Sequence, residues 1–224
     1  MTTAAGKALL FDIDGTLVDT DALHLKAFNL VFGPRGHVFD HDRFTRELQG
    51  FTIASIRERF LSDEPPDRQI AIMEDKEATF RKLASAGVAP SPGLMQLLDF
   101  ADRENIPMAA VTNAPRLNAE MMLSALGIAH RFKAVVIGDE LPHGKPHPLP
   151  YQEALRALGA APDASLAFED SAAGVRSATD AGIATIGMLT SLDDAAMRAA
   201  GAVMTAKNFE TPELIKRVTA MANA

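Results

Sequence analysis

The chain has 224 residues, of which 47% are hydrophobic and 23% are charged, and its formal net charge at pH 7 is −7. This composition is that of a globular protein with a sizeable core, and its acidity argues against nucleic acid or an anionic membrane as a partner. Because the chain has no cysteine, disulfides, thiolate metal sites and thiol nucleophiles are excluded. The N-terminal apolar run is soon interrupted by Asp12, so we expect neither a signal peptide nor a membrane span, and a cytoplasmic location.

Short apolar runs along the chain have the length and the flanking residues of buried β-strands. They cover residues 8–13, 108–112, 134–137, 166–168, 184–188 and 202–205. Helical patterns separate most of these runs, as in residues 92–105, 114–127 and 149–160. Because strand and helix alternate at the spacing of βαβ units, the sequence predicts an α/β fold with a mostly parallel sheet and helices on both faces.

Residues 21–88 interrupt this alternation. Four segments within them have helical periodicity, and no convincing strand pattern separates these segments: 21–33, 40–50, 53–62 and 67–87. We therefore expect an all-helical insert after the first strand. The predicted domains are a core of residues 1–20 and 89–224 and a helical domain of residues 21–88.

Acidic residues are concentrated directly after the first predicted strand. The stretch LLFDIDGTLVDTD contains Asp12, Asp14, Asp19 and Asp21. Residues two apart in a strand point to the same face, so Asp12 and Asp14 should project together at the carboxyl end of the strand, where parallel sheets bind ligands. Such a pair can divide the work of nucleophile or metal ligand and proton donor. The competing interpretation is that Asp14 and Gly15 only form a turn.

Polar residues also end two of the other predicted strands. Thr112 and Asn113 follow one strand, Glu169 and Asp170 follow another, and Lys145 lies in the connection between the two. One lysine cannot balance four carboxylates gathered at one edge of the sheet. Since carboxylate oxygens without histidine or cysteine partners suit Mg²⁺, we predict a magnesium ion at this edge.

These segments together resemble the haloacid dehalogenase-like superfamily. The stretch DIDGT, the strand-final Thr112, Lys145 before a proline, and EDS at residues 169–171 look like its four ordered motifs. The resemblance covers essentially the whole chain, because the helical insert is placed like the helical cap of that family. It implies a Rossmann-like core and lies nearest to the phosphoglucomutase-like and sugar-phosphatase branch.

The resemblance implies a role for each motif residue. Asp12 would attack phosphorus and form an aspartyl-phosphate, while Asp14 would protonate the leaving alcohol and then activate the hydrolytic water. Thr112 and Asn113 would hold phosphoryl oxygens. Lys145 would neutralise charge on the nucleophile and on the phosphate.

The same resemblance implies the metal ligands. Mg²⁺ would be held by the Asp12 carboxylate, the Asp14 backbone carbonyl and Asp170, with Glu169 as a further ligand or as support for the others. Dehalogenases of the family lack the second aspartate of the first motif. Since Asp14 is present here, phosphate-ester chemistry is favoured.

Two residues of the helical insert match further positions in such relatives. His24 either couples closure of the cap to acid–base chemistry or is an ordinary interfacial histidine. The segment around Gly50 resembles the substrate-specificity loop. In β-phosphoglucomutase an arginine three residues after this glycine grips a second phosphate, whereas Ile53 stands here, which favours hydrolysis. Arg57 or Arg59 could replace it from the next turn, although a solvated charged face is the favoured interpretation.

The predicted function is that of a Mg²⁺-dependent phosphatase acting on a small phosphorylated metabolite, such as a sugar phosphate. We expect a monomer or weak homodimer without nucleic acid or membrane partners. One alternative is a hexose-phosphate mutase, and another is a non-catalytic binding protein that retains the fold.

Overall fold

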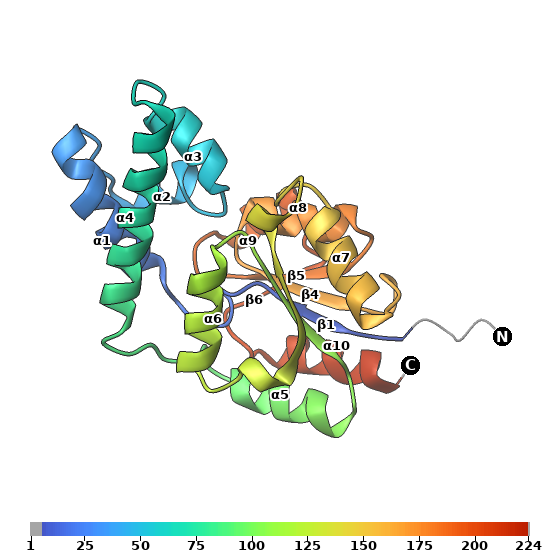
Figure 1. The fold of residues 1–224 in the computed structure, drawn as a ribbon. Coiled ribbons are helices and arrows are strands. Elements are labelled where there is room, and N and C mark those ends of the chain that lie inside the picture. The colour runs from blue at the N-terminus through green and yellow to red at the C-terminus, as the bar shows by residue number, and fades with distance from the viewer. Residues whose placement is uncertain (1–5, 224) are drawn as a thin grey trace.

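A six-stranded parallel sheet forms the centre of the computed structural model, which describes residues 6–223 (Figure 1). The order of the strands is β3-β2-β1-β4-β5-β6. Their bounds are β1 Leu9–Phe11, β2 Met108–Thr112, β3 Phe132–Ile137, β4 Leu166–Glu169, β5 Ala184–Met188 and β6 Met204–Ala206. The fold class is as predicted, and the first five residues of the predicted core segment lie outside the described residues.

Helices cover both faces of this sheet (Figure 1). They are α5 Leu94–Arg103, α6 Arg116–Ala125, α7 Leu149–Leu158, α8 Ala172–Asp180, α9 Asp194–Ala200 and α10 Pro212–Asn223. Within residues 6–223, no helix combines the length and the apolar character that crossing a bilayer requires.

The first strand packs apolar side chains on both of its faces. Leu9 and Phe11 belong to the hydrophobic cluster that includes side chains of α5, α6 and α10, whereas Leu10 belongs to the cluster that includes side chains of α7. The rings of Phe11 and Phe168 stack with centroids 4.8 Å apart. This alternation follows from the two-residue period of a strand, and it explains why a central strand reads as a continuous apolar run.

The predicted bounds hold best for β2 and β5, which match residue for residue. The prediction for the first strand, residues 8–13, is too long because β1 ends at Phe11. The chain turns immediately afterwards, since the carbonyl of Ile13 accepts hydrogen bonds from the backbone N–H groups of Leu17 and Val18. A hydrophobic run does not reveal this turn, because Ile13 is itself fully buried.

Four α-helices, one short 3-10 helix (Gly33–Arg35) and no strand follow β1 in residues 21–88. The α-helices are α1 Asp21–Phe32, α2 His41–Glu47, α3 Ile53–Phe60 and α4 Pro66–Ala84. Phenylalanines of these helices and of the connection before α2, such as Phe28, Phe39 and Phe44, form part of a separate hydrophobic cluster. We call residues 21–88 the helical segment. Its status as an independent domain, like the division into 1–20, 21–88 and 89–224, stays a prediction.

Candidate active site

The polar ends of three central strands and one loop lysine lie at one pocket. Asp12 follows β1, Thr112 ends β2, and Asp170 follows β4. Lys145 reaches the same pocket from the connection before α7. The sequence predicts this convergence, because parallel strands place their carboxyl ends at one edge of the sheet.

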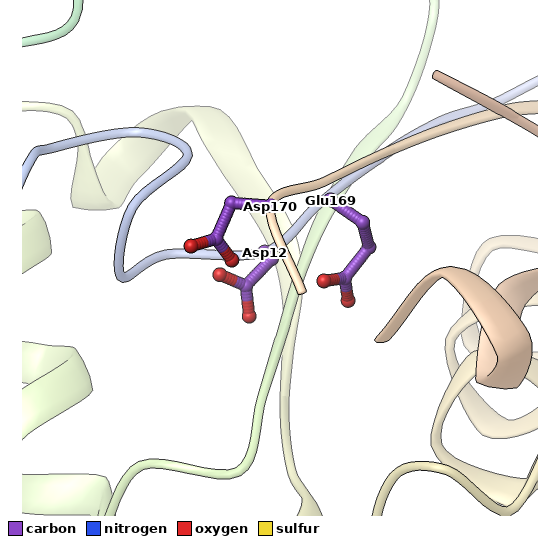
Figure 2. Close-up of side chains that lie close together, drawn as sticks. All are labelled: Asp12, Glu169 and Asp170. Atoms are coloured by element: carbon purple, nitrogen blue, oxygen red, sulfur yellow. The ribbon is translucent and has the colours of Figure 1, made fainter. Parts of the chain in front are cut away.

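Three buried carboxylates gather at this edge. Asp12, Glu169 and Asp170 each offer an oxygen within 4.8 Å of the others. Figure 2 shows the three side chains next to one another, with the Asp12 carboxylate between those of Asp170 and Glu169. Asp12 is 7% exposed, Glu169 0% and Asp170 3%, so water compensates little of the repulsion between their carboxylates.

Lys145 partly offsets this charge. Its Nζ donates to Asp12 Oδ1 at 2.7 Å, to the carbonyl of Val111 at 2.7 Å and to Glu169 Oε1 at 2.5 Å. Burial would lower its pKa, but Asp12 and Glu169 outweigh burial and hold the pKa of Lys145 above its ordinary value. The Tyr151 hydroxyl also donates to Glu169 Oε1, at 2.6 Å. Glu169 therefore orients Lys145 whether or not it also binds a metal.

One lysine leaves the cluster short of positive charge. Burial, only partly opposed by Lys145, raises the pKa of Asp12 well above its ordinary value. Burial and then the negative charge of Asp12 do the same to the pKa of Asp170. Three carboxylates whose oxygens converge within a few ångströms form the oxygen-rich donor set that Mg²⁺ prefers, so the residues present fit that ion.

Asp14 lies apart from the three-carboxylate cluster. Its Oδ1 accepts a hydrogen bond from Thr20 Oγ1 at 2.7 Å and lies 3.2 Å from His24 Nε2. Burial alone would raise the pKa of Asp14, yet the hydrogen bonds from His24 and Thr20 hold it below its ordinary value. Because β1 ends at Phe11, the alternation of a strand does not extend to Asp14. Its carboxylate is instead held by the first turn of α1.

His24 connects Asp14 to the helical segment. Its Nδ1 lies 2.9 Å from Lys76 Nζ, and its ring stacks on Phe80 with centroids 3.7 Å apart. Lys76 and Phe80 both belong to α4, so this histidine joins α1, α4 and the Asp14 carboxylate. That position agrees with the interpretation that His24 couples the helical segment to acid–base chemistry. The role itself stays a prediction.

Both polar ends of the Asn113 side chain are occupied. Its Nδ2 donates to the carbonyls of Lys145 and Gly50 at 3.0 and 3.2 Å, and its Oδ1 accepts from the Lys145 N–H at 3.0 Å. Thr112 Oγ1 accepts from the N–H of Ala114 at 2.9 Å. In this arrangement Asn113 holds the Lys145 loop against the helical segment. Its predicted contact with phosphoryl oxygens stays a prediction.

Gly50 brings the helical segment close to the core. Its φ is +76°, and a Cβ there would lie 2.9 Å from Ser171 Oγ, so a larger residue would be strained and crowded. The adjacent Gln49 places its Nε2 3.0 Å from Asp170 Oδ2 and 3.0 Å from Asp21 Oδ2. Ser191 Oγ lies 2.9 Å from Asp170 Oδ2 and 2.7 Å from Asp21 Oδ2, so its one hydroxyl hydrogen can be donated to either carboxylate. Gln49 and Gly50 thus hold the helical segment over the acidic cluster.

Replacing Gln49 with glutamate should release this contact, because a third carboxylate would face Asp21 and Asp170 with only the Ser191 hydroxyl left as a donor among them. We expect the amide protons of residues 48–51 to exchange with solvent about tenfold or more faster, the effect of losing ~1.4 kcal/mol of local stability. Hydrogen exchange followed by mass spectrometry measures this. Gln152→Glu, which adds the same charge on an exposed site of α7, is the control. Unchanged protection in the Gln49 variant would contradict the assignment.

Comparison with known proteins identifies the family. Residues 9–188, which include β1 to β5 and the three clustered carboxylates, match the model of the haloacid dehalogenase-like hydrolases. The chain belongs to this family. The resemblance inferred from the four motifs is therefore confirmed, and the arrangement of the acidic residues can be compared with that of named relatives.

Several curated relatives are named for an activity on phosphate esters. The phosphorylated carbohydrates phosphatase of Thermotoga maritima is 32% identical over 95% of this chain and 99% of its own length. The fructose-1-phosphate phosphatase of Escherichia coli is 31% identical over 78% of this chain and 92% of its own. A crystal structure of the Rhodobacter sphaeroides protein CbbY with xylulose 1,5-bisphosphate has a TM-score of 0.79 and 31% identity, covering 90% of this chain and 94% of that one.

Several residues of the site were not predicted. They are Asp21, Gln49, Lys76, Tyr151 and Ser191. Ser191 comes soon after β5, so the rule that strand ends carry the site could have indicated it. The other contacts depend on how the helical segment and α7 pack, and no local sequence pattern reports such packing.

Proposed function

We propose that this protein is a Mg²⁺-dependent phosphatase that hydrolyses a small phosphorylated metabolite, such as a sugar phosphate, through an aspartyl-phosphate. The observation that carries the proposal is the 2.7 Å contact between Lys145 Nζ and Asp12 Oδ1, beside Glu169 and Asp170. A lysine in this place favours the ionised form of the carboxylate, which a nucleophile requires, and a bound Mg²⁺ would add to that effect. The names of the relatives from Thermotoga maritima and Escherichia coli support the substrate class.

In the first step an Asp12 oxygen attacks phosphorus as the bond from phosphorus to the alcohol oxygen breaks, and Asp14 gives that oxygen a proton. In the second step water attacks the phosphorus, Asp14 accepts a proton from this water, and the bond to Asp12 breaks to release phosphate. Thr112, Asn113 and Lys145 position the phosphoryl oxygens. The hydrogen bonds that lower the pKa of Asp14 favour its ionised form, which is the base that the second step requires.

Mg²⁺ would be held by the carboxylates of Asp12 and Asp170 and by the Asp14 carbonyl, with Glu169 beside them. When bound, it supplies the positive charge that offsets these carboxylates and the charge developing on the phosphoryl group. Phosphate-monoester hydrolysis can require ~10²¹-fold acceleration, about 28 kcal/mol. Positioning supplies roughly 7–11 kcal/mol of such a barrier. Charge stabilisation and a covalent intermediate therefore have to provide the remainder.

We further propose that residues 21–88 act as a cap on a core of residues 1–20 and 89–224. The contacts of Gln49 and Gly50 with Asp170 and Asn113 support this, because they hold the helical segment over the carboxylates and limit the access of water. A cytoplasmic location, a monomeric or weakly dimeric state and the lack of nucleic acid and membrane partners belong to the same proposal.

No contact among the described residues favours the activity of a hexose-phosphate mutase. Ile53 lines the pocket at the position where the resemblance would require an arginine for that activity. Arg59 Nη2 lies 3.7 Å from a Glu47 carboxylate oxygen instead of at the pocket. Hydrolysis is therefore the preferred activity.

Phosphate release from a panel of esters tests the proposal. The panel contains sugar phosphates, phosphoglycolate, nucleoside monophosphates and β-glucose 1-phosphate, each with Mg²⁺ and with EDTA. We expect release with Mg²⁺ to exceed release with EDTA by about 10³-fold or more, since the metal offsets most of the charge at the site. Equal release under both conditions, or release from no ester, would contradict the proposal. Glucose 6-phosphate formed from β-glucose 1-phosphate with a bisphosphate primer would instead indicate the mutase.

A further inference from the structure

A buried acidic residue lies on the side of the pocket formed by the helical segment. Lys76 and Glu77, adjacent on α4, line the same pocket as Asp12 and are only 3% and 6% exposed. Asn118 of α6 packs against them and is 1% exposed. Charged residues are rarely buried this deeply in a helix that also supplies apolar side chains to the core, such as Met73 and Phe80.

The charge of Lys76 is already paired inside this group. Its Nζ donates to Glu77 Oε1 at 2.9 Å and also contacts His24 Nδ1. Glu77 Oε2 accepts from Asn118 Nδ2 at 2.6 Å, and Asn118 Oδ1 accepts from Arg81 Nη1 at 2.9 Å. Each carboxylate oxygen of Glu77 makes one of these bonds and keeps a lone pair for a further donor.

Glu77 carries its negative charge in this position. Burial would raise its pKa, but Lys76 and His24 hold the pKa of Glu77 below its ordinary value. The effect of that charge extends to the core, where burial and then Glu77 raise the pKa of Asp139 to about 6. Because the charges of Glu77 and Lys76 offset each other, this side of the pocket offers little positive charge to a second anion.

The other cations nearby are paired or point elsewhere. Neither Arg57 nor Arg59 lines this pocket. Arg116, at the start of α6, binds both oxygens of Glu140 at 2.7 and 2.6 Å. Arg81 bonds only the neutral Asn118 amide, but it does not line the pocket. The two lysines that do line it, Lys76 and Lys145, are both paired with carboxylates, so the described lining residues leave no unpaired lysine or arginine for a second phosphate.

We propose that Glu77 is a specificity-determining residue that selects phosphate monoesters whose distal part is uncharged and rich in hydroxyl groups, and that rejects sugar bisphosphates. A sugar hydroxyl can donate to the free lone pairs of Glu77, whereas a second phosphate has only acceptors to offer and is repelled. This inference rests on the proposed phosphatase activity. It would distinguish this chain from the relative CbbY, whose crystal structure contains xylulose 1,5-bisphosphate.

The test compares kcat/KM for fructose 1-phosphate and fructose 1,6-bisphosphate with Mg²⁺ present. We expect the unmodified protein to prefer the monophosphate by about 100-fold, as one repelled charge in a poorly solvated pocket allows. Glu77→Gln should reduce this preference about tenfold or more, mainly through a lower KM for the bisphosphate, because Lys76 loses its partner and becomes available. Glu74→Gln, at an exposed position of the same helix, should leave the preference unchanged.

Two results would overturn the inference. In the first, the unmodified protein hydrolyses both esters equally well. In the second, the Glu77→Gln variant loses activity on both esters in equal proportion. Calorimetric titration of Asp12→Asn with the same two ligands and Mg²⁺ gives their Kd values without turnover. If no ester is hydrolysed, the phosphatase proposal fails, and the ratio of the two Kd values still decides whether this pocket disfavours a second phosphate. A ratio near one would refute the role of Glu77.

Discussion

Replacing Asp12 with asparagine is expected to lower the rate of phosphate release at saturating substrate by at least about three orders of magnitude. The amide has nearly the same shape but lacks the charge needed to attack phosphorus, and a covalent intermediate cannot form on it. Asp12 is 7% exposed and bonded to Lys145, so no neighbouring oxygen can occupy its place without moving that lysine. Steady-state kinetics with the best ester of the panel measures the loss.

The same variant should remain folded, and its unfolding temperature without metal should be equal to or higher than that of the unmodified protein. Burial raises the pKa of Asp12, which means that the ionised form is disfavoured in the folded state, so removing the charge relieves repulsion. Asp19→Asn is the matched control, because Asp19 is exposed in the same segment and should keep its activity. An Asp12 variant that retains more than about a tenth of the activity would exclude the nucleophilic role.

Replacing Lys145 with methionine should have the largest effect on stability. Methionine preserves much of the apolar stem but leaves Asp12 and Glu169 without their shared cation in a site closed to water. Removing one partner of a buried ion pair typically costs about 3–5 kcal/mol, so we expect a loss of this size in the free energy of unfolding. Chemical denaturation in the presence of EDTA measures it, and phosphate release should be lost in the same variant.

Addition of Mg²⁺ should restore part of this stability, since a cation that binds only the folded protein shifts the equilibrium towards it. Lys133→Met, at an exposed position of β3, removes the same charge and should change the unfolding midpoint little. An unchanged midpoint for the Lys145 variant would show that the carboxylates are not held together by that lysine. Comparing the Lys145 and Lys133 variants thus separates the effect of losing a cation within the carboxylate cluster from the effect of changing the net charge of the protein.

The sheet could be predicted from the sequence because its central strands are buried on both faces and therefore appear as apolar runs. Residues 108–112 and 184–188 match β2 and β5 completely for this reason. The first strand was predicted too long because Ile13 is as buried as a strand residue although the chain has already turned. A run of apolar residues indicates that a segment is buried. It indicates a strand only where the buried segment is also extended.

The site could be predicted where its residues end strands, and not where they come from packed helices. The positions of Asp12, Thr112 and Asp170 at one edge follow from the parallel order of the strands. Lys76 and Glu77 lie on a buried face of α4, and nothing in their local sequence distinguishes them from an exposed ion pair. Their importance arises only from the contact of α4 with α1 and α6, which the sequence does not specify locally.

The central place of β1 in the sheet has a consequence for the synthesis of the protein. Leu9 to Phe11 are synthesised before both of their neighbours, which are β2, beginning at Met108, and β4, beginning at Leu166. This apolar segment therefore waits without partners while most of the chain is made, and it is then enclosed from both sides. A nascent chain that stops before Leu166 lacks one neighbour of β1 as well as Glu169 and Asp170, so the proposed metal site can form only after the chain has been made beyond Asp170.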